Sequence, residues 1–111
     1  MRLFFAELPG FTKECLQKAS DEELRQFQND LAESPDSGDL IQGTGGLRKA
    51  RFRLAGRGKS SSARVIYLWL PHVPCIILFH FYTKQTKDDL SASDKKALRE
   101  AVQIIKSCYH P

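Results

Sequence analysis

The sequence has little cysteine and no long hydrophobic run, and each absence excludes a class of protein. Its three cysteines lie far apart and form no C-x-x-C pair, so neither a disulfide framework nor a zinc site is expected. No apolar stretch approaches the roughly 18 residues that a membrane-spanning helix requires. The opening MRLFFAELPG holds an apolar run too short for a signal peptide. We therefore expect a cytoplasmic protein that binds no membrane, metal or cofactor.

Carboxylates are missing from the middle of the chain. Residues 40–87 contain nine Lys or Arg and no Asp or Glu, whereas residues 1–39 contain four basic and nine acidic residues. Residues 88–111 contain four of each sign. This segregation indicates a surface that faces a polyanion, with RNA or DNA the leading candidates. A basic face that meets only solvent is the alternative.

Two glycine-rich stretches invite a nucleotide-binding interpretation, and both fail on spacing. GRGKS at 56–60 contains the G-K-S of a phosphate-binding loop, but Arg53 occupies the position where that motif needs its first glycine. The segment that follows, ARVIYLW, has the composition of a strand rather than of the required helix. GTGG at 43–46 lacks the dinucleotide-binding spacing and also leads into a strand. We interpret it as a turn that delivers the chain into a sheet.

The length of 111 residues fits one domain, covering 1–111. RLFFAEL predicts a short strand, and a short helix follows it. Ser20 and Glu23 have the spacing of a capping box at the start of a second helix, and Ser91 and Asp94 have it at the start of a last one.

Three further runs, at 47–55, 63–71 and 75–83, are rich in β-branched and aromatic residues and predict strands. Their short connections allow only antiparallel pairing. The fold class is therefore α+β: a small twisted antiparallel sheet with helices packed on one face and the other face open.

Strand alternation divides the charges of the first basic strand between the two faces. Lys49 and Arg51 share the open face, while Phe52 and Leu54 point to the core, and Arg48 is on the core side near the edge. The predicted sheet gathers a patch of cations: Lys49, Arg51, Arg64, Lys84 and Lys87. Such a patch attracts the RNA backbone and stabilises the charge that develops at phosphorus during cleavage.

Aromatic and histidine side chains accompany this patch. Tyr82 is suited to stack on an unpaired base. His80 shares its parity with Tyr82, although a histidine in an apolar strand is more often a packed core residue. The full set of predicted RNA-binding residues is Arg48, Arg53, Arg57, Lys59, His80 and Tyr82.

Three stretches resemble the HigB branch of the RelE superfamily of bacterial toxins. They are GD-I-QGTGGLRK-R, the G-GK-S-S-ARVIY hairpin, and Y-K---DLS before the last helix, within roughly residues 20–106. The resemblance implies a RelE-like microbial-RNase fold and a toxin that enters the ribosomal A site. There it would cleave mRNA without a metal, using the ribose 2′-OH as nucleophile.

The resemblance also implies partners and catalytic residues. The partners are a cognate HigA-like antitoxin with a helix-turn-helix domain and, only through that complex, operator DNA. The lysines of the family's first active-site strand match Lys49 and Arg51, the arginine that opens the next strand matches Arg64, and the last basic positions match Lys84 and Lys87. The tyrosine of RelE after its last strand is missing, since DDLS stands there. His80 is then the only candidate for the histidine of some HigB proteins.

Two other functions remain open at this point. A non-catalytic RNA- or ribosome-binding module would use the same basic face without cleaving anything. A purely structural domain would dock an acidic protein there.

Overall fold

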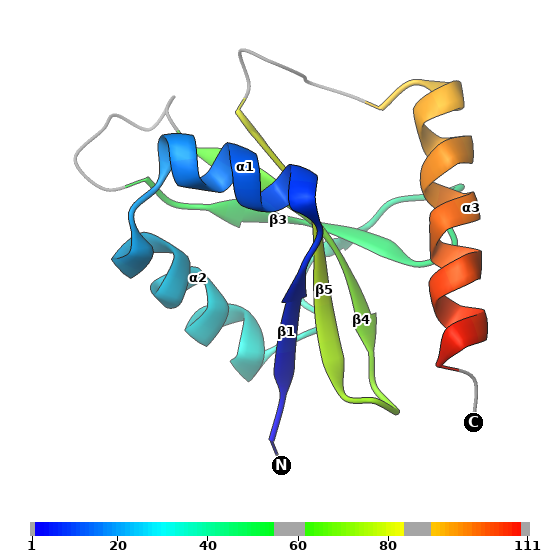
Figure 1. The fold of residues 1–111 in the computed structure, drawn as a ribbon, viewed down its shortest axis with the longest axis horizontal. Coiled ribbons are helices and arrows are strands. Elements are labelled where there is room, and N and C mark those ends of the chain that lie inside the picture. Colours follow the sequence, from blue (N-terminus) through cyan, green and yellow to red (C-terminus); the bar gives the residue numbers. More distant parts are fainter. Residues whose placement is uncertain (1, 55–61, 84–89, 110–111) are drawn as a thin grey trace.

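The structure is a computed structural model that describes residues 2–54, 62–83 and 90–109. Figure 1 shows a central sheet with helices on both sides. The elements in chain order are β1 (Phe4–Glu7), α1 (Pro9–Lys18), α2 (Asp21–Glu33), β2 (Asp39–Leu40), β3 (Leu47–Phe52), β4 (Ala63–Leu70), β5 (Cys75–Thr83) and α3 (Ala92–Cys108).

Both predicted capping boxes are confirmed. The Ser20 hydroxyl accepts a hydrogen bond from the Glu23 backbone N–H at 3.1 Å, and the Glu23 carboxylate accepts one from the Ser20 N–H at 2.8 Å. Ser91 and Asp94 make the same reciprocal pair at the start of α3. Each pair satisfies two backbone donors that the first turn of a helix leaves unbonded, so these residues set where α2 and α3 begin.

The five strands lie in the order β1-β5-β4-β3-β2. The antiparallel pairing of β3 with β4 and of β4 with β5 is confirmed. The prediction of a purely antiparallel sheet is wrong, because β1 pairs parallel to β5. Parallel neighbours need a long connection, and everything from α1 to β4 lies between these two strands.

One face of the sheet is covered by α1 and α2. Phe52 of β3 lies at the centre of this core, with its ring centroid 5.0 Å from those of Phe27 and Phe81. Alternate residues of the three long strands complete the layer, which includes Ala50, Phe52, Ala63, Val65, Tyr67, Ile76, Leu78 and Phe81.

The opposite face is covered in part by α3, so the prediction that the helices share one face is wrong for this helix (Figure 1). A second apolar cluster lies beneath it, formed by Leu47, Ile66, Leu68, Leu70, Ile77, Phe79 and Val102. The physical reason is that β4 and β5 are apolar at consecutive positions, which is typical of strands buried on both faces. The apolar stripe of α3 supplies the second cover.

A β-bulge interrupts the pairing of β4 with β5. Ile66 lies opposite His80 and Tyr67 lies opposite Leu78, so Phe79 is an extra residue in β5. Phe79 is buried in the cluster under α3, and His80 next to it is exposed. The bulge therefore lets β5 present both apolar and polar side chains to the same face.

Candidate RNA-binding face

Three of the predicted cations lie on the second sheet face, beside the α3 cluster. We call this part of the face the cation face and define it by Lys49 and Arg51 of β3, Arg64 of β4, and His80 and Tyr82 of β5. Residues directly opposite each other in an antiparallel pair point to the same face of a sheet. Lys49 lies opposite Ile66 and Arg51 lies opposite Arg64, which places all three cations on the face of the buried Ile66.

Two rows of side chains cross the cation face. One row runs Lys49, Ile66, His80 and the other runs Arg51, Arg64, Tyr82, each residue directly opposite the next. Like charges placed directly opposite each other destabilise a sheet. The Arg51–Arg64 pair therefore places two like charges on neighbouring strands, and the Arg64 guanidinium donates to the Ala63 carbonyl at 3.3 Å. An anion that bound both guanidinium groups would relieve this repulsion, since a planar guanidinium matches the geometry of a phosphate.

Arg48 does not join this face. Its guanidinium donates to the backbone carbonyls of Asp36 and Gly38, at 3.0 and 2.9 Å. The Tyr67 hydroxyl holds the same loop, because it donates to the Pro35 carbonyl at 2.7 Å and accepts from the Gly38 N–H at 3.0 Å. Burial is the main cause that raises the pKa of Tyr67. Arg48 thus anchors the segment after α2 on the opposite side of the sheet.

The other predicted cations fall into two groups. Arg53 is exposed just beyond the end of β3. Arg57, Lys59, Lys84 and Lys87 lie outside the described residues. Of the five residues predicted as catalytic, the structure therefore places Lys49, Arg51 and Arg64, and it brings these three together.

Asp39 is the functional candidate that the sequence analysis missed. It lies on β2 directly opposite Lys49 and is exposed, so a carboxylate stands beside the cations. The glycine turn is the sequence feature that could have revealed Asp39, because a tight turn at 43–46 pairs the residues before it with the residues after it. Asp39 also lines a cavity of about 320 Å³ between α2 and the free edge of β3, together with Glu23, Asp30, Lys49 and Arg51.

The glycine stretch is confirmed as a turn, and it also anchors α3. Lys106 donates to the Gly45 carbonyl at 2.8 Å and Arg99 donates to the Gly43 carbonyl at 3.3 Å. Gly45 has a φ of 79°, and a Cβ at this position would lie 3.4 Å from Val102. The turn needs glycine both for its backbone conformation and for the close approach of the helix.

Within the described ranges, no group of three or more His, Cys, Asp or Glu side chains is arranged to hold a metal ion. In the same part of the chain, no helix is both long and apolar enough to cross a membrane.

No family model matches the chain. Solved structures of E. coli toxin RelE share its fold. A double arginine-to-alanine mutant in the free state aligns with a TM-score of 0.59 and 18% identity, over 78% of this chain and 88% of RelE. The isolated toxin aligns at 0.52 and 20%, over 92% and 97%. The intact E. coli RelBE toxin–antitoxin complex aligns at 0.53 and 18%, over 72% and 94%. The chain has the α+β fold of the RelE toxins.

Proposed function

We propose that this protein is the toxin of a type II toxin–antitoxin system and that it cleaves mRNA on the ribosome. The observation that carries the proposal is the row of Arg51, Arg64 and Tyr82 beside Lys49, on a part of a RelE-fold sheet that none of the described helices covers. The row combines cations for a phosphodiester with an aromatic ring for a base. A basic segment without carboxylates, residues 40–87, supplies the whole of β3, β4 and β5.

In this reaction the ribose 2′-OH attacks the adjacent phosphate. Lys49, Arg51 and Arg64 stabilise the negative charge that builds up on the phosphoryl oxygens, the role that a metal ion plays in other nucleases. The reaction therefore needs no metal. Tyr82 stacks on a base next to the scissile phosphate and aligns it. Arg53 extends the backbone contacts, and the same is proposed for Arg57, Lys59, Lys84 and Lys87.

Induced expression in a bacterial host tests the proposal. The wild-type protein should arrest growth, and mapping of mRNA 5′ ends should show new ends within translated codons. Arg64→Ala, or Lys49→Ala with Arg51→Ala, should lower the cleavage rate by about 100-fold or more, the usual cost of removing a donor that stabilises transition-state charge.

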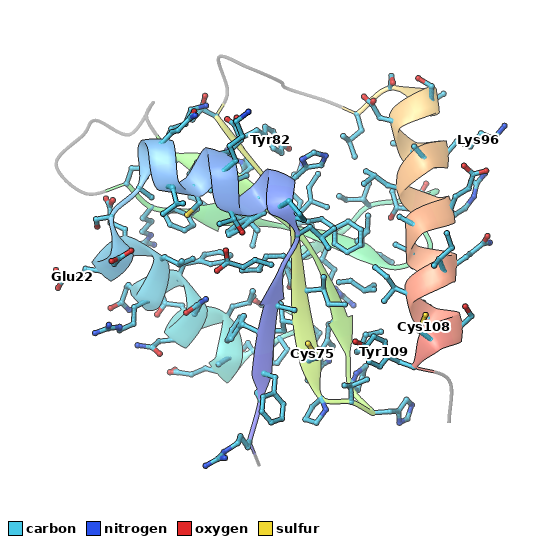
Figure 2. All side chains as sticks on the ribbon, viewed as in Figure 1. Glu22, Cys75, Tyr82, Lys96, Cys108 and Tyr109 are labelled. Atoms are coloured by element: carbon cyan, nitrogen blue, oxygen red, sulfur yellow. The ribbon has the colours of Figure 1, made fainter. Side chains whose placement is uncertain are left out.

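Lys96→Ala is the matched control, because it removes one positive charge from a side chain that projects from α3 away from the sheet (Figure 2). It should leave cleavage unchanged. Growth arrest without new 5′ ends would instead identify a non-catalytic ribosome-binding module. If Arg64→Ala and the double variant Lys49→Ala with Arg51→Ala both kept full activity, the assignment of the cation face would be wrong.

The partner proposed on the sequence motifs is a HigA-like antitoxin with a helix-turn-helix domain, and operator DNA is bound only through the complex. The E. coli relative is known as a complex with its own antitoxin, which supports a partner of this kind. The site of action is the cytoplasm, where ribosomes translate. Co-expression of a downstream helix-turn-helix reading frame should restore growth and co-purify with the toxin, and failure of both would exclude that partner.

A further inference from the structure

A cavity of about 290 Å³ lies at the far end of the sheet from the cations, and the proposed function does not use it. It is lined by the last residues of β4, the turn that joins β4 to β5, and the last turn of α3 (Figure 1). Arg64 is the second residue of β4 and Leu70 is the last. A strand rises about 3.3 Å per residue, so about 20 Å separates this cavity from the cation face.

One wall of the cavity is a stretch of β4 that extends past the start of β3. β3 begins at Leu47, opposite Leu68, and the Leu47 carbonyl accepts a hydrogen bond from the Ile41 N–H, so the backbone groups of Leu47 point away from β4. Backbone groups alternate in direction along an antiparallel pair, so those of Tyr67 point toward β3, and those of Trp69 do the same two residues later. The Trp69 N–H and carbonyl therefore face a notch where β3 supplies no partner.

Lys106 of α3 gives this cavity its charge. Its ammonium donates to the Gly45 carbonyl at 2.8 Å, and a Cβ on Gly46 would lie 3.4 Å from the Nζ, so the ammonium lies where the chain enters β3. An ammonium has three N–H donors, so two are left for a ligand. Lys106 is in the last turn of α3, where it offsets the partial negative charge of the helix end. None of the residues that line the cavity is Asp or Glu, so the cavity is suited to an anion.

The rest of the cavity wall is largely apolar. Leu70, Pro71 and Val73 line it on the side of the sheet, together with the half-buried Trp69. Tyr109 lines it on the side of α3, and Figure 2 shows this residue at the end of the helix beside the β4–β5 hairpin. The Tyr109 side chain is 54% exposed, so an aromatic ring is available at the opening. An apolar wall with a few polar groups at one side is typical of a small-molecule site.

We propose that this cavity binds a small apolar carboxylate, of the size of a phenylalkanoic acid. The carboxylate accepts hydrogen bonds from the Lys106 ammonium and from the Trp69 backbone N–H, and the apolar body lies between the Tyr109 ring and the side chains of Leu70 and Val73. Hydrogen bonds from an ammonium to a carboxylate are among the stronger ones in proteins, so the charge of the ligand decides its affinity. The inference is independent of the proposed function, because it uses none of the residues of the cation face.

Nuclear magnetic resonance titration of the isotope-labelled full chain tests the site. Trp69 is the sole tryptophan, so it gives a single indole N–H signal inside the proposed site. Hydrocinnamate should shift the Trp69 and Tyr109 signals with a Kd on the order of 1 mM, as expected for a ligand of this size. Its uncharged amide should bind at least about tenfold more weakly, because it lacks the charge-assisted hydrogen bond. Lys106→Met should lower the affinity for hydrocinnamate by a similar factor and leave that for the amide unchanged.

Lys96→Met is the matched control, because it removes the same charge from α3 at a side chain that projects away from the sheet (Figure 2), and it should bind like wild type. Lys106→Arg keeps the charge and should retain hydrocinnamate binding even if the loss of the Gly45 contact in Lys106→Met closes the cavity to both ligands.

The site is wrong if hydrocinnamate leaves the Trp69 signals in place, if the amide binds as well as the carboxylate, or if Lys106→Arg binds neither ligand. It is also wrong if Lys106→Met binds both ligands like wild type. Shifts confined to Arg51 and Tyr82 would mean that the cation face attracts the carboxylate instead, which equally overturns the proposal.

Discussion

The two faces of the sheet are formed by the same strands, but one face is apolar and the other is partly cationic. Toward α1 and α2, strands β3, β4 and β5 bury an apolar layer that includes the anchored Tyr67, and the charged Arg48 lies at its edge. Toward α3 the same strands carry an apolar part, which the helix covers, and a cationic part that none of the described helices covers. There Arg51 and His80 are exposed, and Lys49, Arg64 and Tyr82 are half-buried. The difference shows that apolar burial and positive charge are separated by strand alternation rather than by domain or by sequence segment.

Acidic and basic side chains are also divided between the two sides of the sheet. The first turn of α2 is acidic at three successive positions, Asp21, Glu22 and Glu23, and Glu22 points outward from that side of the molecule (Figure 2). The cations lie on the opposite sheet face. If the proposed function holds, this division orients an approaching RNA, because one face attracts a polyanion and the other repels it.

The largest expected effect is on the free energy of unfolding. Two neighbouring residues of β3 that point to different faces test it. Phe52→Ala should lower the free energy of unfolding by about 3–5 kcal/mol, because it empties a site between two other rings. Arg51→Ala, one position away and exposed, should change it by less than about 0.5 kcal/mol while cleavage falls. Chemical denaturation of both variants measures this, and similar destabilisation by both would refute the separation of roles.

A pair of glycine substitutions compares the helices of the two faces. Gly45→Ala, under α3, should cost about 1–2 kcal/mol, because its φ of 79° is unfavourable for a side chain. Gly10→Ala, in α1, has nothing within 4 Å of the added Cβ and should stabilise by about 0.4–1 kcal/mol. Opposite signs in thermal melting are expected. A neutral Gly45→Ala would mean that the turn and α3 are not tightly joined.

The smallest expected effect concerns the Cys15 thiol, which lies near the acidic first turn of α2. Burial, followed by Glu7, Glu23 and Asp21, raises the pKa of Cys15 from 9.0 to about 11. The folded state then holds this proton between pH 9 and 11 while the unfolded state releases it, so the contribution of Cys15 to stability falls as pH rises through that window. Alkylation should label the exposed Cys108 first and Cys15 only near pH 11. Equal labelling rates at pH 8 would contradict the buried position.

Much of the local structure follows from the sequence. Ser20 and Ser91 mark the helix starts because a capping box involves residues only three positions apart. The cations of β3 divide correctly between faces because alternation within a strand is a local property. The resemblance in the motifs anticipated the RelE fold, which the solved structures confirm.

Other features depend on which segments meet. The bulge at Phe79 reverses the parity of β5 between Leu78 and Phe81, which both face α1 and α2 although they are three residues apart. Arg48 was predicted as an RNA contact, and the structure shows its guanidinium bound to the carbonyls of Asp36 and Gly38. These outcomes are set by partners distant in the chain, which one-dimensional patterns do not specify.

The sequence alone determined that residues 40–87 form a basic, strand-rich segment, because composition and alternation are written into the chain. Only the tertiary structure decided that α3 covers part of one sheet face, that β1 pairs in parallel with β5, and that Asp39 lies opposite Lys49. The physical reason is that a side chain's face is fixed by its own strand, whereas its neighbours are fixed by the register and packing that bury the most apolar surface.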